Sequence, residues 1–191
     1  KILPIESYNE LKNNYDLAKI NAEDVKIINT LPVGEVDAHI KSKNFNNDLY
    51  TGTADRITQA KLQTGLIQAK DNRMKKIKND SVQFLIDTNP NIAELTNDYR
   101  LENDPEVKKS NRTILTNALI EEQTRMKINP SNIKILTKQE ALSINKVLLD
   151  ENETIENKIN FIDSLPTIYG SDNMGKIQLQ LQQEKLPTAY L

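Results

Sequence analysis

The sequence contains no cysteine, no tryptophan, a single histidine (His39) and five glycines. Without cysteine the chain has no disulfide, no thiolate nucleophile and no cysteine-ligated metal site. A metal site built on several histidines is excluded too, and a catalytic histidine would have to be His39 itself. The glycines are scattered and form no phosphate-binding loop. We therefore predict no catalytic, cofactor-binding or metal-ligating residue.

The sequence also lacks an excess of charge of either sign. Its 25 basic and 27 acidic residues leave a net charge of −2, whereas binding to nucleic acid needs a concentrated basic surface. The densest basic run contains Arg73, Lys75, Lys76 and Lys78, and we interpret it as a solvated helix face. No apolar run approaches the roughly 18 residues of a membrane span. The sequence thus indicates neither a nucleic-acid footprint nor a transmembrane segment, and no small-molecule substrate is evident.

Two pairs of neighbouring acids, Glu121-Glu122 and Asp150-Glu151, are the remaining candidates for acid–base chemistry. Neighbours on a helix point about 100° apart, so the two carboxylates of a pair do not converge on one site. We interpret both pairs as solvated helix surface. An enzyme would instead need a deep cleft lined by buried acids around His39 or Glu140.

What the sequence does contain is helical periodicity. Its apolar fraction of 37% is below the usual value of about 45–50%, which predicts a thin core, but the apolar residues recur at helical spacing throughout. No stretch has the alternating pattern of a strand. We predict an all-α fold, an elongated bundle of about nine helices without a sheet, two of the helices being long.

The stretch Pro105–Ile128 is the predicted central helix, with Asp104 as its cap and Pro105 at its first position. Its apolar side is formed by Val107, Ile114, Leu115, Ala118, Leu119 and Met126. The charged residues, Arg112 among them, are expected elsewhere around the helix. We expect residues 114, 115, 118 and 119 to be buried against the other long helix, Ala54–Lys78.

That second long helix is expected to begin after a cap at Thr53 and to carry two apolar seams. One seam contains Ile57, Ala60, Thr64, Ile67 and Met74, and the other contains Leu62, Leu66, Ala69 and Ile77. Two seams indicate contact with more than one neighbour. Gly65 lies in mid-helix, where it disfavours the helix by roughly 1 kcal/mol relative to alanine, so a close helix crossing is expected there.

The other elements are shorter. Before residue 53 we predict a helix around Tyr8–Ala18, a second helix Ala22–Thr30 opened by Asn21, a stop at Leu31–Pro32, and a short helix Gly34–Lys41. A polar loop follows over Ser42–Gly52. Later helices are predicted over Ser81–Asp87 after the cap Asp80, over Asn91–Tyr99, after a capping box at Thr137–Glu140, after Thr154, and over Asp172–Glu184. The predicted domains are 1–52, with short helices and a loop, and 53–191, the main helical domain.

From about Ile57 onward, the order of helix starts and stops resembles the helical regions of large bacteriophage and prophage virion-associated proteins. The resembling segments are Asp80-Ser-Val-Gln-Phe84, Asn89-Pro-Asn-Ile92, Asp104-Pro105, Gln123-Thr-Arg-Met-Lys-Ile-Asn-Pro130, Ile135-Leu-Thr-Lys-Gln-Glu-Ala141, Tyr169-Gly170 and Leu186-Pro187. Proteins of this kind travel in the capsid and cross the host envelope with the genome. Some carry a peptidoglycan-cleaving domain elsewhere in the chain, but no residue here matches its catalytic carboxylates.

The resemblance implies a non-catalytic structural segment of a virion or DNA-ejection protein. Its partners would be other virion proteins or further copies of itself, and its location would be the virion, or the host cytoplasm during assembly. Because the chain begins at Lys1 and not at Met, we expect it to be a piece of a longer protein. The alternative is a cellular helical module that binds proteins, such as an adaptor or effector domain. An enzyme with an unrecognised site is a third, weaker alternative.

Overall fold

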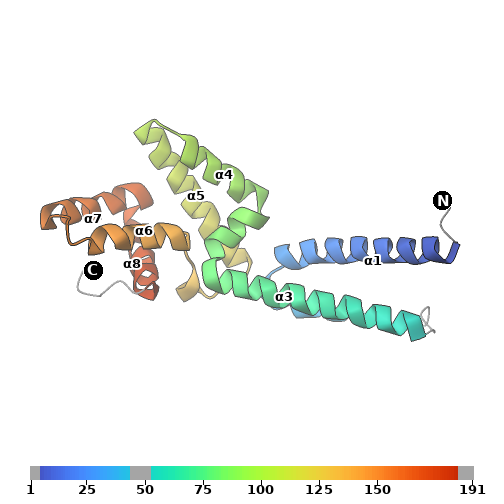
Figure 1. Ribbon diagram of the computed structural model, residues 1–191. Helices are drawn as coiled ribbons and strands as arrows, with labels where there is room; N and C mark the ends of the chain where they lie inside the picture. The colour runs from blue at the N-terminus through green and yellow to red at the C-terminus, as the bar shows by residue number, and fades with distance from the viewer. Residues whose placement is uncertain (1–4, 44–52, 185–191) are drawn as a thin grey trace. The chain divides into compact units, whose positions relative to one another are not determined.

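The computed structural model describes residues 5–43 and 53–184, and every regular element in these two ranges is helical (Figure 1). The all-α prediction is confirmed. The described ranges contain eight α-helices and not about nine, since the boundary expected at Asn21 lies inside α1 and the one expected at Asp80 is a kink within α3. The predicted loop Ser42–Gly52 lies mostly outside the described residues.

The α-helices are α1 (Ile5–Thr30), α2 (Val36–Ser42), α3 (Thr53–Thr88), α4 (Pro90–Leu101), α5 (Pro105–Arg125), α6 (Lys138–Leu149), α7 (Ile155–Tyr169) and α8 (Met174–Gln183). Short 3-10 helices at Val33–Glu35, Pro130–Asn132 and Ser171–Asn173 join some of them. The longest helices are α3 with 36 residues and α1 with 26, whereas the predicted long pair was Ala54–Lys78 and Pro105–Ile128.

The first correction concerns Asn21, which was expected to open a helix and instead lies inside α1. Its side chain faces α3 at Gly65, where an added Cβ would lie 3.1 Å from the Asn21 side-chain nitrogen Nδ2. The space beside Gly65 is thus occupied by a side chain of α1, and a larger residue at this position would meet Asn21. The helix ends at Thr30, as the following Leu31–Pro32 predicted.

The second difference concerns Asp80, where the predicted boundary between two helices is present as a kink inside α3. Its backbone angles, φ −153° and ψ 92°, are not helical. Its carboxylate oxygen Oδ1 accepts a hydrogen bond from the Gln83 amide at 2.9 Å, so Asp80 does cap the following turns as predicted. The helix resumes directly, and the two predicted helices are one element with a break. The predicted cap at Thr53 involves a side chain outside those the structure describes.

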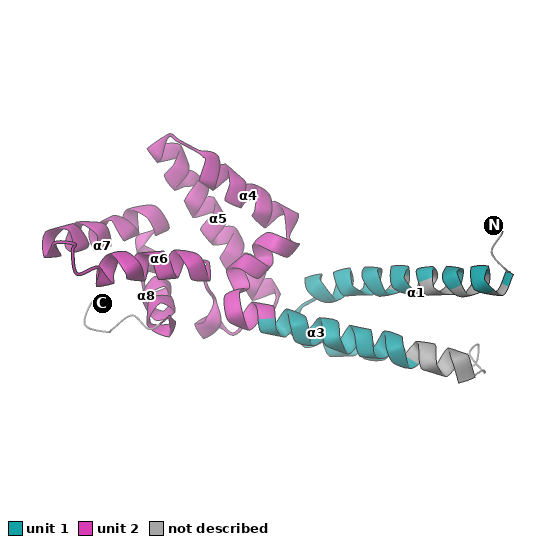
Figure 2. Cartoon of the chain, in the orientation of Figure 1, with its two compact units in different colours: residues 1–75 teal, residues 76–191 magenta. Residues whose placement is uncertain are grey.

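The chain divides into two compact units, residues 1–75 and residues 76–191 (Figure 2). The described part of the first unit contains α1, α2 and most of α3, with α1 and α3 side by side. The second unit contains the end of α3 and helices α4 to α8. This division differs from the predicted boundary at 52/53, because Leu66 of α3 shares a core with Ile28 of α1.

Unit 1 has a small core formed by Ile28, Val36, Ile40 and Leu66. Beside it, Arg73 is buried, and its guanidinium donates hydrogen bonds to the carbonyl oxygens of Ile28 and Leu31, at the end of α1. A cation there also interacts favourably with the negative end of the helix dipole. The prediction that Arg73 belongs to a solvated basic face is therefore wrong, while Lys75, Lys76 and Lys78 are exposed as expected.

Unit 2 contains two apolar clusters. The first joins the end of α3 to α4 and α5 through Val82, Phe84, Leu85, Ile92, Leu115, Leu119 and Met126. The second joins α6, α7 and α8 to the segment before α6 through Ile135, Leu136, Ala141, Ile144, Leu148, Leu165, Tyr169, Ile177 and Leu181.

The predicted burial of the central helix is right for Leu115 and Leu119 and wrong for Ile114, which is 49% exposed. The predicted partner also changes. Leu115 and Leu119 pack with residues of α3 that follow the break at Asp80 and with α4, and among the described side chains of Ala54–Lys78 the one that joins this cluster is Ile77. Helix α4 folds back along α5 and covers the side that carries Leu115 and Leu119. The apolar spacing of α5 alone did not show that this side is buried and that Ile114 is not.

Candidate functional site

The segment between α5 and α6 organises the polar interior of unit 2. Ile135 and Leu136 are fully buried there, outside any helix, so their backbone groups need hydrogen-bond partners other than a helix ladder. Buried Gln180 and Arg112 provide these partners, and a third buried polar residue, Gln123, binds the backbone of the neighbouring Lys134.

The two glutamines hold this segment from different helices. The Gln123 side chain of α5 donates to the Lys134 carbonyl at 2.6 Å and accepts from the Lys134 amide at 3.0 Å. The Gln180 side chain of α8 accepts from the amides of Ile135 and Leu136 at 3.2 and 3.1 Å and donates to the Leu136 carbonyl at 2.5 Å. A side-chain amide carries both donors and an acceptor, so it pairs with the two kinds of backbone group at once.

Arg112 is the third partner and is only 2% exposed. Its Nη2 donates to the Ile135 carbonyl at 2.8 Å, and its Nη1 donates to Glu140 Oε1 at 3.0 Å. The guanidinium also lies 5.0 Å from the ring centre of Tyr99 and 4.6 Å from that of Tyr169, which are cation–π distances. The expectation that Arg112 lies on the polar side of the central helix is therefore wrong.

Glu140 connects this arginine to the start of α6. The Thr137 hydroxyl accepts from the Glu140 amide, and Glu140 Oε2 accepts from the Thr137 amide at 2.7 Å, so the predicted capping box is present. With Oε1 bound to Arg112, both carboxylate oxygens are engaged. Glu140 is thus a structural acid that joins a helix cap to a buried cation.

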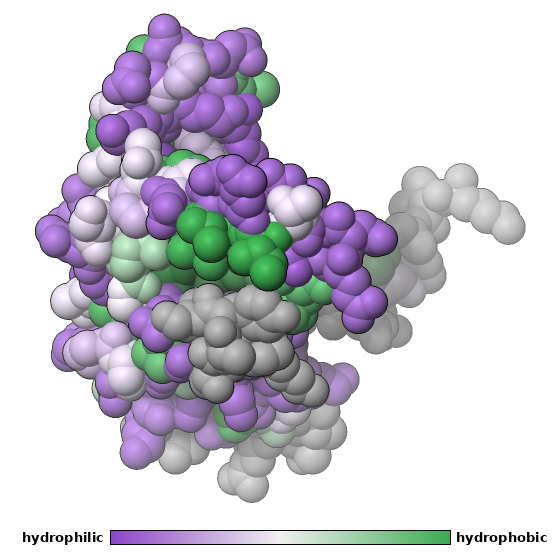
Figure 3. Space-filling model, turned by 90° about the vertical axis from the view of Figure 1, so that its left-hand side faces the viewer, coloured by the Kyte–Doolittle hydropathy of each residue, from purple (hydrophilic) through white to green (hydrophobic). Residues whose placement is uncertain are grey.

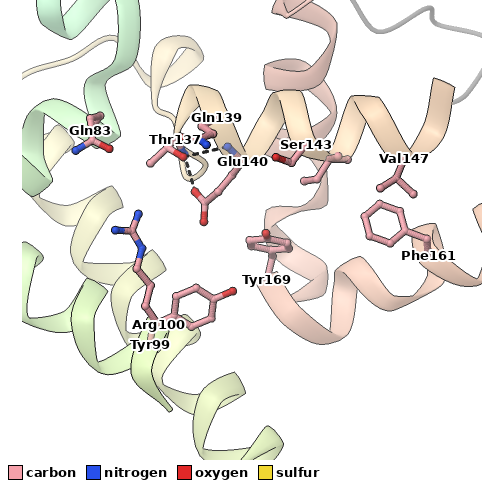
Figure 4. Close-up of a pocket in the computed structure, with 11 residues that line it drawn as sticks. Gln83, Tyr99, Arg100, Thr137, Gln139, Glu140, Ser143, Val147, Phe161 and Tyr169 are labelled. Atoms are coloured by element: carbon pink, nitrogen blue, oxygen red, sulfur yellow. Dashed lines mark hydrogen bonds between the residues drawn. The ribbon is translucent and has the colours of Figure 1, made fainter. Parts of the chain in front are cut away.

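An open cleft of about 610 Å³ lies next to these hydrogen bonds of Thr137 and Glu140 (Figure 4). It is lined by Gln83, Tyr99, Arg100, Thr137, Gln139, Glu140, Ser143, Ile144, Val147, Phe161 and Tyr169. In Figure 4, Tyr99 and Arg100 extend from α4 toward Glu140 of α6, and Tyr169 of α7 lies beside them. Glu140 is the single carboxylate among these lining residues, so the cleft offers aromatic faces and hydrogen-bonding groups but no pair of acids.

Burial raises the pKa of the Tyr169 phenol to about 12, although the nearby Arg112 acts in the opposite direction. The phenol therefore stays protonated at neutral pH. A group held in its neutral form this firmly is a poor general base and serves as a hydrogen-bonding wall of the cleft.

The paired acids lie on the surface and do not converge. Glu122 forms an ion pair with Arg125 at 2.6 Å, and this hydrogen bond lowers the pKa of Glu122. Hydrogen bonds from Asn152 lower the pKa of Asp150 in the turn after α6. Both acids therefore have local partners. The expected helix surface is found for Glu121-Glu122, whereas Asp150-Glu151 lie in the turn that follows α6 and not on a helix.

His39, the other residue singled out from the sequence, belongs to unit 1. Its Nε2 lies 3.5 Å from Asp24 Oδ1, and the same oxygen pairs with Lys43 Nζ at 2.6 Å. Asp24 is buried, and its carboxylate contacts both the imidazole of His39 and the ammonium group of Lys43. No group of three potential metal ligands occurs in the ranges 5–43 and 53–184, and no helix within them is long and apolar enough to cross a membrane.

Sequence reasoning missed the buried polar residues Arg112, Gln123 and Gln180. A signal for the first two was present, since Arg112 and Gln123 are spaced by three, four or seven residues from Leu115, Leu119 and Met126, and so share their helix face. Gln180 likewise follows Ile177 by three residues. The chain matches no family model, and the comparisons with curated proteins and with solved structures found no match.

Proposed function

We propose that this chain acts through protein–protein contacts, as a non-catalytic structural segment of a bacteriophage virion or DNA-ejection protein. The observation that supports the contact role is a strip of exposed apolar side chains on α1. Ile5, Tyr8, Leu11 and Tyr15 are 57–76% exposed and are spaced by three or four residues, which places them along one side of the helix.

The strip is large for a solvated helix. Single exposed apolar residues are ordinary, whereas a contiguous row of large ones with two tyrosines is typical of a contact surface. Tyrosine is enriched at such surfaces because it has a large apolar body and one polar end. Among the described side chains of α1, Ile28, near the other end of the helix, belongs to the core of unit 1, and none of the strip residues does.

A second apolar row lies on α3. Of the two predicted seams, the one containing Leu66 is packed, whereas Ile67 and Met74 of the other seam are 45% and 39% exposed. Figure 3 shows a further apolar area on the mostly hydrophilic face turned to the viewer. These surfaces fit a segment that assembles with other proteins or with copies of itself.

The virion assignment rests on the resemblance in helix starts and stops from about Ile57 onward. The alternative function is that of a cellular helical module binding other proteins, since an exposed apolar strip suits both. The genes beside this one distinguish the two: portal, capsid and tail genes are expected for a virion protein, and their absence would favour the cellular module.

The contact role is tested by light scattering on the purified chain, alone and with virion proteins encoded beside it. We expect a mass above that of the monomer, or a complex with a virion protein, that is lost in the double variant Tyr8→Ser, Tyr15→Ser. The control is Lys12→Ser with Lys19→Ser, which changes two exposed polar positions of the same helix. A monomer that binds none of these proteins, or association unaffected by the tyrosine changes, would contradict the proposal.

A further inference from the structure

From Tyr8 onward, the apolar strip of α1 continues along the helix with smaller residues. Ala18 and Ala22 are exposed, and Val25 is half-buried. Together with the larger members of the strip they form a row, here called the heptad row, that consists of Tyr8, Leu11, Tyr15, Ala18, Ala22 and Val25. Its spacings alternate between three and four residues, which is the spacing of side chains that pack along a second helix in a coiled coil.

The heptad row is separate from the side of α1 that packs inside unit 1. Asn21 faces Gly65 of α3, and Ile28 belongs to the core of this unit. Asn21 and Ile28 are seven residues apart and share one side of the helix, whereas Ala22 follows Asn21 directly and points about 100° away from it. Figure 2 shows α1 beside α3 within unit 1. A further helix can therefore bind the row while α1 keeps its contacts with α3.

The side chains of the heptad row become smaller along α1. Tyr8, Leu11 and Tyr15 in its first half are large, whereas Ala18 and Ala22 in its second half are small. Two copies of α1 in the same direction would place large residues against each other at one end and leave empty space between alanines at the other, which close packing disfavours. Two copies in opposite directions instead place a large residue against a smaller one in every layer: Tyr8 against Val25, Leu11 against Ala22, and Tyr15 against Ala18.

We propose that α1 pairs with the α1 of a second copy of this chain in the antiparallel direction, with the twofold axis between positions 16 and 17. In this arrangement the row is complementary to itself, as an interface between two identical chains must be. A tyrosine buries roughly 150–250 Å² in such a contact, so four tyrosines with the leucines and alanines between them bury on the order of 1,000 Å², the area that a specific interface needs. The pairing rests on the contact role proposed above and specifies the partner of the strip.

Disulfide formation tests the direction of the pair, because the chain has no cysteine of its own. The variants Leu11→Cys and Ala22→Cys are mixed in equal amounts and oxidised, and mass spectrometry of the digested product identifies which positions are linked. We expect the disulfide between positions 11 and 22 to dominate. The two positions 22 of an antiparallel pair are about 16 Å apart along the helix axis, too far for a disulfide, which needs Cα atoms within about 7 Å. A dominant 22–22 product, or a random mixture of the three products, would overturn the proposal.

Exchange of a large and a small residue tests the register. Tyr15→Ala leaves a gap opposite Ala18, and Ala18→Tyr places a second ring against Tyr15, so each change should weaken self-association about tenfold or more, measured by sedimentation velocity. The double variant again has one large and one small residue in this layer and should regain most of the affinity. Ala60→Tyr makes the same change at an exposed position of α3 and should leave the affinity unchanged. A double variant weaker than both single variants, or an equal effect of Ala60→Tyr, would contradict the register.

The outcomes separate this pairing from the contact role on which it rests. A chain that stays monomeric while its strip binds a virion protein would overturn the pairing and leave the contact role in place. A chain that binds neither a second copy nor a virion protein would contradict both.

Discussion

At the scale of single residues, buried polar side chains replace the backbone partners that a helix would provide. Gln123 and Gln180 together bind backbone groups of Lys134, Ile135 and Leu136. Gln123 also accepts from the Ser81 hydroxyl at 2.9 Å, which links the end of α3 to the same segment. An apolar residue at either position would leave several buried groups unpaired, which costs more than a single hydrogen bond contributes.

Gln180→Leu tests this directly. It keeps the side-chain volume similar but leaves the amides of Ile135 and Leu136 and one carbonyl without partners. We expect the free energy of unfolding, measured by urea denaturation, to fall by about 2–4 kcal/mol. Gln182→Leu on the exposed side of the same helix is the control, and equal effects in the two variants would show that the buried amide is not decisive.

The raised pKa of Tyr169 predicts that the stability of the folded chain decreases at alkaline pH. Its folded-state pKa is about 12, against about 10 in the unfolded chain, so the native state holds the phenolic proton more tightly. This contribution, about 3 kcal/mol, is fully present below pH 10 and is lost as the pH rises from 10 to 12. The measurement is denaturation at several pH values for the wild type and Tyr169→Phe. The difference in stability between them should change over this range, and a constant difference would contradict the shifted pKa.

At the scale of elements, the faces of α5 are assigned by its neighbours. Residues 114 and 115 are adjacent and similar in apolar character, but Leu115 is buried and Ile114 is half exposed. The same helix carries Arg112 and Gln123 on its buried side. The packed face is thus a mixture of apolar and polar residues, and the exposed face retains apolar ones.

Truncation of leucine and isoleucine on α5 separates these faces. Leu119→Ala removes a side chain that is 1% exposed and should lower the free energy of unfolding by roughly 2–5 kcal/mol. Ile114→Ala removes a similar side chain on the half-exposed face and should cost clearly less. Chemical denaturation of both variants is the measurement, and an unmoved midpoint for Leu119→Ala would place this face of α5 outside the core.

The break at Asp80 shows how one residue serves two elements. Its Oδ1 caps the last turns of α3, and its Oδ2 accepts from the Lys138 amide at 2.6 Å, at the first residue of α6. The segment after the break is therefore connected to both α5 and α6. This explains why residues 76–88 belong to unit 2 although the helix that contains them begins in unit 1.

At the scale of the whole molecule, the two units have unequal cores. The described part of unit 1 has one cluster of four buried apolar residues, while unit 2 has two larger clusters joined by the glutamine network. Local stability follows buried contacts, since segments with few of them open at low free energy. The units should therefore differ in their resistance to opening.

Hydrogen exchange measured by mass spectrometry tests this difference. We expect the amides of α5, α6 and α8 in unit 2 to exchange more slowly than those of residues 5–20 in α1. A partner that covers the apolar strip of α1 should slow exchange in that stretch. Uniform exchange across the two units would contradict the inequality of their cores.

The sequence alone was sufficient for the helical class and for several helix ends. Thr137 and Glu140, Asp104 before Pro105, and Leu31–Pro32 act through neighbours within a few residues, so their roles follow from local spacing and are found in the structure. A close neighbour at Gly65 was expected because a glycine within a helix is unfavourable, and the structure places the Asn21 side chain there.

Only the tertiary structure decided which polar residues are buried and which apolar ones are not. Arg73 and Arg112 are inside because carbonyl oxygens distant in the chain, those of Ile28, Leu31 and Ile135, need donors there. Ile114 is half exposed because α4 and the end of α3 cover the neighbouring face. Such partners are separated by more than twenty residues, and helical periodicity carries no information about contacts at that distance.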